Sequence, residues 1–191
     1  AAVKDKMFAL RDFSDEIKTE YPPKTFNLPD LQKEANKAFG FALDKTLALA
    51  QSLYEKKLIT YPRTDSPLLP ESDLNKYYTL IGKLASEGEK KLIPSDNRKP
   101  PCVRDSDSAH TALIPTGGLP QNLPEDEAKL YELIRSRFIT AFMFPRTYHQ
   151  YTLVIADEEG HTLKARVTCD IDKGYKALHS RKKDTDETAD R

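Results

Sequence analysis

The chain has 191 residues, no formal net charge at neutral pH, and a composition that is 38% hydrophobic and 31% charged. These values fit a soluble globular protein of one compact domain or two small ones, with enough residues for a real core. The zero charge balance gives no sign of nucleic-acid binding for the chain as a whole. We expect no membrane association, because no apolar run is long enough to span a bilayer and no signal peptide is evident.

The two cysteines, Cys102 and Cys169, lie far apart and belong to no paired motif. This excludes a disulfide framework and a zinc site, and it favours a reducing, cytoplasmic setting. The chain begins at Ala1 without a methionine and ends in a polar stretch. We expect residues 179–191 to be a disordered tail or the cut end of a longer protein.

The first 27 residues are interpreted as a connecting segment. Residues 7–17 fit either a short strand or a helical turn, and Pro22-Pro23 breaks whatever precedes it. Next, a helix is predicted from about Leu28, with Asn27 as its cap and Gly40 at its end.

Three more helices are predicted from apolar residues at helical spacing, over residues 43–56, 71–86 and 124–145. The helix over residues 71–86 is expected to stop near Gly88, and the helix over residues 124–145 is expected to have Asn122 as its cap. The irregular stretch between them, residues 94–124, is too long for an idle loop in a compact domain. Two strands joined by a turn then follow over residues 148–155 and 162–168. The predicted fold class is therefore α+β and mainly α, with a helical domain over residues 28–145 and a small antiparallel β-hairpin over residues 146–178.

Side chains suited to catalysis are most concentrated in residues 58–66. A predicted helix precedes Tyr61, and Pro62 ends any continuation of that helix. Cleavage of a phosphodiester by a protein needs a nucleophile and cationic donors to the phosphoryl oxygens. Tyr61 offers a hydroxyl, and Arg63 offers a planar guanidinium that suits phosphate. From the pattern alone, a buried strand tyrosine beside a surface arginine is the favoured alternative. Residues 31–63 carry six basic and three acidic side chains, which fits a solvated helix face or a modest phosphate footprint.

The second cluster is residues 108–116, with His110 in the long irregular segment. A histidine near a transferred phosphate can donate to an oxygen or carry a proton, although from this cluster alone a loop histidine in solvent is the favoured interpretation. Asp105 and Asp107 have the spacing of an Asp-x-Asp pair but lie in a serine-rich stretch and are interpreted as solvated. The remaining histidines are interpreted as surface residues.

Taken together, the two clusters resemble the type IA DNA topoisomerases. Residues 54–66, YEKKLITYPRTDS, are similar to that family's active-site signature, and residues 110–116, HTALIPT, are similar to its histidine motif. Residues 31–53, residues 130–138 and Gly174-Tyr175 resemble flanking segments, so the likeness covers most of residues 28–178. Ile114 stands before Pro115 where other branches often have arginine, which points toward the topoisomerase III branch.

The resemblance implies a fold and a chemistry. The helical domain would be the gate of a toroid, inserted in an arch of β-strands. Tyr61 would attack single-stranded DNA and form a 5′-phosphotyrosyl link, Arg63 would hold the scissile phosphate, and His110 would contact a phosphate or assist proton transfer. The resemblance also implies DNA contacts by Lys56, Lys57, Thr64, Asp65, Ser66 and Thr116.

The family also uses a Toprim domain that supplies a glutamate, a lysine and an Asp-x-Asp pair for Mg²⁺, and no such segment is evident here. We therefore expect the metal, the Toprim domain and the rest of the arch to belong to a longer parent protein, and no metal site in this chain. The chain by itself is expected to be inactive, and a covalent DNA adduct formed by it alone would refute this.

Two other functions stay open at the level of the sequence. A non-catalytic module for single-stranded nucleic acid would stack Tyr61, Phe39 and Phe41 on bases. It would hold the backbone with Lys56, Lys57 and Arg63. A helical interaction domain would have no affinity for DNA even at low salt. A tyrosine recombinase is disfavoured, because its arginines and histidines precede a tyrosine near the end of the domain.

Overall fold

The computed structural model describes residues 7–104 and 110–180, and it divides into two compact units. The helical unit comprises residues 22–144, and the strand unit comprises residues 7–21 together with 145–180. Helices and a three-stranded antiparallel sheet together confirm the predicted α+β class. Asp105, Asp107 and residues 181–191 lie outside the described residues, so the expectations for them are not addressed.

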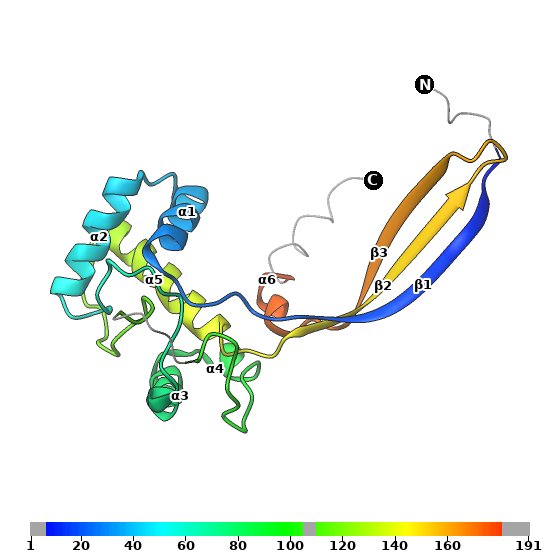
Figure 1. Cartoon of the computed structure of the whole chain (residues 1–191). Helices are drawn as coiled ribbons and strands as arrows, with labels where there is room; N and C mark the ends of the chain where they lie inside the picture. Colours follow the sequence, from blue (N-terminus) through cyan, green and yellow to red (C-terminus); the bar gives the residue numbers. More distant parts are fainter. Residues whose placement is uncertain (1–6, 105–109, 181–191) are drawn as a thin grey trace, which may run out of the picture. The chain divides into compact units, whose positions relative to one another are not determined.

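The helical unit contains α1 (Leu28–Phe39), α2 (Leu43–Glu55), a 3₁₀ turn η1 (Glu71–Asp73), α3 (Leu74–Leu84), α4 (Glu87–Lys90) and α5 (Glu125–Thr140) (Figure 1). The predicted ends of α1 are confirmed. The side chain of Asn27 accepts a hydrogen bond of 2.8 Å from the backbone N–H of Asp30. Gly40 ends the helix in the left-handed region with φ 69°, where a residue without a Cβ has no steric penalty.

The predictions for the middle of the unit were wrong in two details. The helix expected over residues 71–86 begins as a 3₁₀ turn and stops at Leu84, because Ser86 and Glu89 form a capping box that starts α4. Gly88 therefore lies inside α4. Asn122 does not cap α5; it adopts a left-handed backbone with φ 52°, and the cap position is Pro124, which makes no side-chain hydrogen bond.

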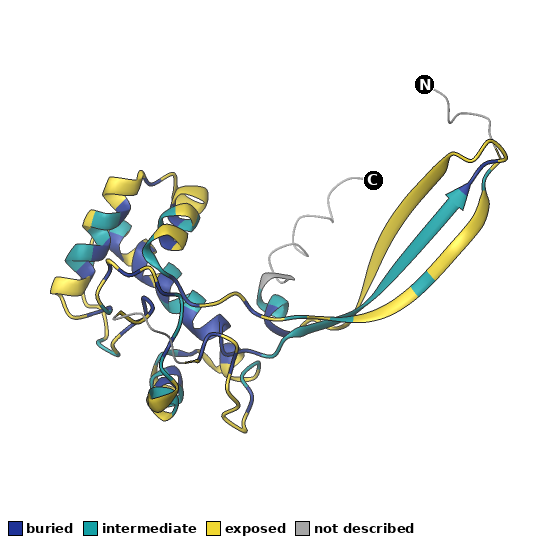
Figure 2. Ribbon diagram, in the orientation of Figure 1, coloured by how far each residue is buried: buried dark blue, intermediate teal, exposed yellow. Residues whose placement is uncertain are grey.

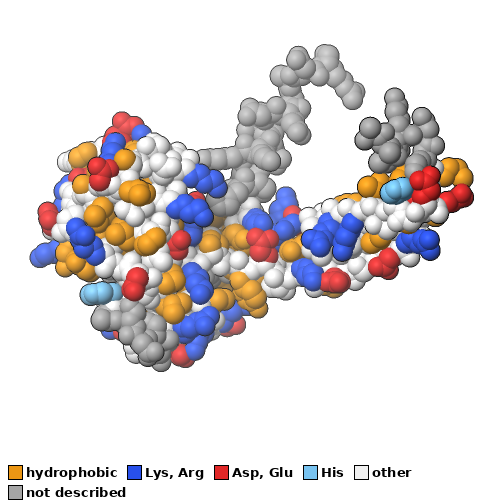
Figure 3. Space-filling view, turned by 45° about the horizontal axis from the view of Figure 1, so that its top comes forward, with side chains coloured by type: hydrophobic (Ala, Val, Ile, Leu, Met, Phe, Trp, Pro, Cys, Tyr) orange, Lys and Arg blue, Asp and Glu red, His pale blue; other side chains and the backbone are white. Residues whose placement is uncertain are grey.

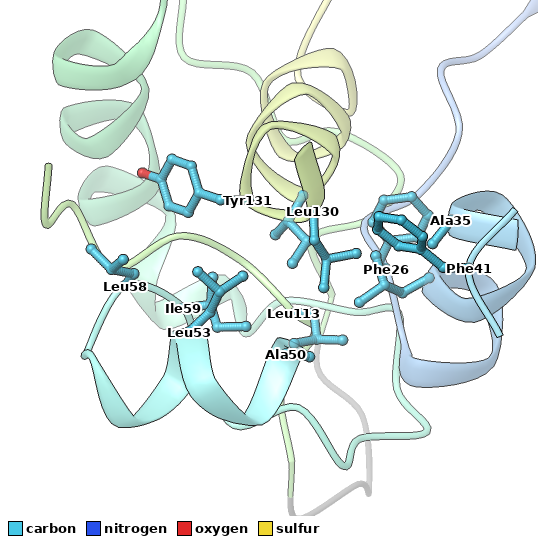
Figure 4. Close-up of a cluster of buried hydrophobic side chains, with 12 residues drawn as sticks. Phe26, Ala35, Phe41, Ala50, Leu53, Leu58, Ile59, Leu113, Leu130 and Tyr131 are labelled. Carbon is cyan, nitrogen blue, oxygen red and sulfur yellow. The ribbon is translucent and has the colours of Figure 1, made fainter. Parts of the chain in front are cut away.

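The core of the helical unit lies between α1, α2 and α5 and the extended segments that pass beside them (Figure 4). Helix α5 contributes Leu130 and Ile134, both fully buried, and α2 contributes Leu53. Two extended segments add Ile59 and Leu113, which are 1% exposed. The residues that flank Tyr61 and His110 in the sequence are therefore part of the core, which fixes where those two side chains can lie.

The strand unit is a sheet of β1 (Ala9–Glu20), β2 (Arg146–Ala156) and β3 (Thr162–Asp172), with β2 in the centre and all neighbours antiparallel. The interpretation of residues 1–27 as a connecting segment missed β1, which is a strand of 12 residues. Phe13 and Ile17 stand four residues apart, a spacing that a helix and a strand both allow. Pairing with β2, far away in the sequence, selects the strand.

One face of this sheet is apolar and open. The register places Phe13 and Ile17 of β1 on the same face as Val167 of β3, and each is more than half exposed. An irregularity between Leu10 and Asp12 brings Leu10 to that face as well. Figure 2 shows the outer strands largely exposed and β2 intermediate. After β3, the short turns η2 (Gly174–Lys176) and α6 (Ala177–Ser180) follow, so the expected tail begins in a helical turn.

Glu20, at the end of β1, holds three partners of the strand unit together. Its carboxylate accepts hydrogen bonds from Lys176 (2.8 Å), from the Tyr175 hydroxyl (2.6 Å) and from Arg146 (3.1 Å). The hydrogen bonds from Lys176 and Tyr175 lower the pKa of Glu20 from 4.5 to about 2. The ionised carboxylate therefore fastens β1 to β2 and to the turn after β3.

Replacement of Glu20 by glutamine is expected to destabilise the strand unit at neutral pH by about 1 kcal/mol, a value reduced for solvent screening because the carboxylate is partly exposed. Since folding lowers this pKa, the stabilisation is complete above pH 4.5 and is lost as the pH falls toward 2. Hydrogen exchange of the β1 amides measures this contribution of Glu20 to the stability of the strand unit. Wild type and variant should differ at neutral pH and converge near pH 2; a difference that persists at pH 2 would show that the charge is not its cause.

Candidate active site

Tyr61 is carried to the surface by the end of α2. Helix α2 closes with hydrogen bonds from Lys57 N to Tyr54 O (2.8 Å) and from Leu58 N to Leu53 O (3.0 Å). Lys57 takes a left-handed backbone with φ 59°, which turns the chain out of the helix. The next two residues are buried, and Pro62 is buried as well, whereas Tyr61 is 39% exposed. The exposed Tyr61 thus lies between buried segments of the chain on either side of it in the sequence.

The two predicted clusters are joined by backbone hydrogen bonds. Ile59 and Pro115 form an antiparallel bridge. On either side of it, Thr60 N donates to Ile114 O (2.9 Å) and Thr116 N donates to Leu58 O (3.0 Å). The same segment is tied to the start of the unit by a bond from Leu113 N to Phe26 O (2.8 Å). Segments about fifty residues apart are therefore aligned in one short ladder.

This ladder brings His110 against Tyr61. The centroids of the two rings are 5.4 Å apart, with a tilt of 46° between them. On its other side, Tyr61 meets Tyr54 edge-on, with ring centroids 5.5 Å apart. Both contacts are in the range of favourable ring pairs, so they orient the Tyr61 ring while its surface remains partly open. The sequence predicted Tyr61 and His110 as site residues and left Tyr54 as a motif residue without a role.

Thr60, which no sequence argument singled out, connects the two clusters through its side chain. Its hydroxyl donates to Ala112 O (2.9 Å) and accepts from Ile114 N (3.0 Å), and both partners are buried. A buried backbone group that loses its only side-chain partner keeps the full cost of its desolvation. Thr60 therefore fixes the position of the His110 segment.

Replacement of Thr60 by valine, which has the same shape without the hydroxyl, is expected to destabilise the chain by about 1–3 kcal/mol. Replacement by serine keeps the hydroxyl and should cost less than half as much. Urea unfolding of the three proteins measures the difference. Equal losses for valine and serine would mean that packing of the methyl group, and not the hydrogen bonds, holds the segment.

Arg63 follows the tyrosine on the open side of the chain. Its side chain is exposed, and within residues 7–104 and 110–180 no hydrogen bond or ion pair holds it. Asp65 is also exposed. Arg63 thus lies two residues from Tyr61 with a charge that an added phosphate can approach.

Thr64 and Ser66 were predicted as DNA-binding residues, and their side chains are buried in this structure. They are 3% and 6% exposed. The Thr64 hydroxyl accepts from Ser66 N (3.2 Å), and the Ser66 hydroxyl accepts from Leu68 N (3.2 Å). These bonds build a tight turn of the kind that short hydroxyl side chains favour. The two hydroxyls therefore shape the loop, and contact of these residues with DNA stays a prediction.

The remaining predicted DNA-binding residues are exposed but partly engaged. Lys56 forms an ion pair with Glu127 of α5, a carboxylate that also accepts from Ser52 (2.9 Å). The hydrogen bond from Lys56 lowers the pKa of Glu127 below its ordinary value, so the carboxylate stays ionised and holds the lysine in an ion pair. Thr116 donates its hydroxyl to Lys57 O (2.5 Å). Glu127 had no signal in the sequence, because its partner is 71 residues away.

Phe41, proposed as a base-stacking residue in the binding-module alternative, is 4% exposed and lies under the Lys45 ammonium. It belongs to the core, whereas Phe39 beside it is 37% exposed. Lys and Arg side chains are dispersed over the visible face of the helical unit, interspersed with acidic and hydrophobic ones (Figure 3). No large basic surface is visible on that face.

The part of the chain that the structure describes holds one group of three side chains with metal-binding potential: Asp157, Glu159 and His161, in the turn between β2 and β3. These residues belong to the strand unit, and Tyr61 belongs to the helical unit. The turn is built by hydrogen bonds from the His161 backbone and ring to Asp157, at 2.8 Å each. Among the described residues, this group of three does not include a side chain of the Tyr61 loop.

Cys102 is buried and Cys169 is exposed, and both are free thiols. Among the described residues, no helix is both long enough and apolar enough to cross a bilayer.

Comparison with known proteins identifies relatives of this chain. The family described as DNA topoisomerase matches residues 1–190. DNA topoisomerase 3 of Bacillus subtilis is 32% identical over 97% of this chain and 26% of its own length. DNA topoisomerase 1 of Pyrococcus horikoshii is 43% identical over 65% of this chain and 19% of its own length. Among solved structures, full-length topoisomerase I from Thermotoga maritima matches with a TM-score of 0.67 and 27% identity, over 98% of this chain and 31% of that one.

These relatives define a protein of the type IA DNA topoisomerase class. The chain belongs to the DNA topoisomerase family, and the resemblance seen in the sequence is confirmed. It spans about a quarter of the length of the Bacillus relative. The match to a protein named topoisomerase 3 agrees with the predicted branch, and proteins named topoisomerase 1 match as well.

Proposed function

We propose that this chain is the gate part of a type IA DNA topoisomerase and that Tyr61 cleaves one strand of DNA. The phenol of Tyr61 gives up its proton, its oxygen bonds to the phosphorus, and the bond from phosphorus to the 3′ oxygen breaks. The 3′ oxygen takes a proton and leaves as a hydroxyl, while the 5′ side stays linked to the protein. After another strand has passed, the reverse reaction restores the DNA, and no ATP is needed because the ester retains the bond energy.

The observation that carries this proposal is the exposed Tyr61 ring packed against His110 by the ladder between their segments. An imidazole beside the phenol can donate to a phosphoryl oxygen or carry a proton between the tyrosine and the leaving 3′ oxygen. Arg63 has the guanidinium that binds two oxygens of one phosphate. Lys57 and Asp65 lie at the exposed edges of the same loop, where we place contacts to the strand.

The site is half complete in this chain. A tyrosine hydroxyl has an ordinary pKa of about 10, so it needs nearby positive charge to react at neutral pH. Lys56 is paired with Glu127, and Arg63 is a cation two residues after Tyr61 in the sequence. We propose that a Toprim domain of the parent protein supplies the remaining groups, including Mg²⁺, which would offset the charge of the phosphate. The chain alone is then inactive, and the parent acts on single-stranded DNA in the cytoplasm, at the nucleoid.

The test is to identify the amino acid that carries DNA in the parent protein. The parent is incubated with a single-stranded oligonucleotide and Mg²⁺, denatured, and digested with nuclease and trypsin. Trypsin cleaves after Lys57 and Arg63, so the peptide of residues 58–63 contains Tyr61 as its only tyrosine. Mass spectrometry should find this peptide with an added nucleotide on Tyr61.

Two outcomes would contradict the proposal. A nucleotide on another peptide would assign the nucleophile elsewhere. Binding of the oligonucleotide without any modified peptide would favour the non-catalytic binding module. The 191-residue chain, treated in the same way, serves as the control that should give no adduct.

A further inference from the structure

A hollow adjoins the active-site loop on the side of α3. It has a volume of about 580 Å³ and lies between α3 and residues 114–117. Thr60, the residue before Tyr61, also lines it. This volume is within the range of about 300–1,000 Å³ that is typical of sites for small organic groups. The hollow is thus next to the proposed point of DNA cleavage and large enough for one nucleotide.

Among the described residues that line it, the charged ones are Lys76 and Lys83 of α3, and both are positive. Lys76 forms an ion pair with Asp73, with 2.6 Å between its ammonium nitrogen and a carboxylate oxygen. Lys83 makes no ion pair with any residue that the structure describes. An exposed ammonium at the rim of a hollow is available to a phosphate.

The walls also suit a base. Leu80, Ile114 and Pro115 provide apolar surface, and Asn75 and Thr79 add polar groups. Gly117 closes one end with φ 94°; a Cβ there would stand 3.0 Å from Leu80 Cδ1, so glycine permits the close approach. A nucleobase needs apolar contact for its faces and hydrogen-bonding groups for its edge, whereas its phosphate needs a cation.

We propose that this hollow holds one nucleotide of the strand that Tyr61 attacks, with its base against the apolar wall and its phosphate on Lys83. The inference rests on the proposed function and adds a binding site for the strand beside the bond that is cleaved. Because Thr60 joins the hollow to the tyrosine, the bound nucleotide would help to fix which phosphate faces Tyr61.

The test is photocrosslinking with the parent protein. A series of oligonucleotides carries one photoreactive thymidine analogue at successive positions from the cleaved bond. Trypsin cleaves after Lys76 and Lys83, so residues 77–83 form one peptide, which is distinct from the peptide of residues 58–63. We expect a few neighbouring positions to crosslink to the peptide of residues 77–83. If the nucleotide adduct forms on Tyr61 and no position crosslinks to that peptide, the hollow is not a strand site and the proposed function still stands. If no adduct forms on Tyr61, the proposed function fails whatever the crosslinks show.

Substitution of Lys83 gives an independent measurement. Lys83→Ala in the parent should weaken binding of the oligonucleotide about threefold to tenfold and lower the salt slope of the affinity by about 1. Lys83→Arg, which keeps the charge, should restore most of the loss. Lys33→Ala, which removes an exposed lysine from α1, is the matched control and should bind like wild type. Unchanged binding by Lys83→Ala, or an equal loss with Lys33→Ala, would overturn the assignment.

Discussion

Replacement of Tyr61 by phenylalanine in the parent protein is expected to abolish the DNA adduct and lower strand passage by at least about 10⁴-fold, the scale seen when a catalytic nucleophile is removed. Only the hydroxyl is lost. The ring keeps its contacts with Tyr54 and His110, and among the described residues no hydrogen bond holds that hydroxyl. Stability should therefore change by less than about 0.5 kcal/mol. The measurements are the denaturing-gel adduct assay and thermal unfolding of the same preparation.

Tyr54 provides a matched control for this experiment. It is exposed to the same extent as Tyr61, at 39%, and its ring touches that of Tyr61. Tyr54→Phe makes the same chemical change on the neighbouring ring and should leave adduct formation within about threefold of wild type. An adduct that survives in Tyr61→Phe and disappears in Tyr54→Phe would move the nucleophile to Tyr54.

The second large effect is expected at Glu89, far from the chemistry. Its side chain is 9% exposed. Each of its two carboxylate oxygens accepts a hydrogen bond from the guanidinium of Arg135, at 3.1 and 3.2 Å. Burial alone would raise the pKa of Glu89, but the hydrogen bonds from Arg135 and Ser86 hold that pKa below its ordinary value. Glu89→Gln keeps the shape and leaves a largely buried guanidinium with part of its charge uncompensated. We expect a loss of about 3 kcal/mol in urea unfolding at neutral pH.

Glu132 is the control for this effect because it contacts the same arginine. It meets Arg135 at 2.6 Å but is 58% exposed. Glu132→Gln should therefore cost less than about 1 kcal/mol, as is usual for solvent-exposed ion pairs. If the two substitutions cost the same, burial does not decide the strength of these pairs. A double-mutant cycle of Glu89→Gln with Arg135→Met measures the coupling directly.

The sequence by itself determined the class of protein and the identity of the candidate nucleophile. The signature around Tyr61 and the motif at His110 are contiguous runs of residues, so each is readable without a fold. The ends of α1 were also predictable, because Asn27 and Gly40 act on the backbone within a few residues of themselves. Local interactions of this kind leave their mark in local sequence.

Other features were decided only by the tertiary structure. β1 is a strand because β2 pairs with it, and its own residues allowed a helical turn as well. Thr64 and Ser66 stand in the most specific motif of the chain, yet their hydroxyls are used inside a turn. The contacts of Glu127 and Thr60 were not readable from the sequence, since their partners lie 71 and more than 50 residues away.

The meeting of Tyr61 with His110 belongs to both levels. The sequence supplied the two side chains, and the resemblance supplied the expectation that they work together. Their distance is set by the ladder between residues 58–60 and 114–116, by the Thr60 hydroxyl, and by the burial of Ile59 and Leu113 in one core. Such long-range contacts form only when the whole chain packs, because the free energy that holds them comes from the burial of surfaces distant in sequence.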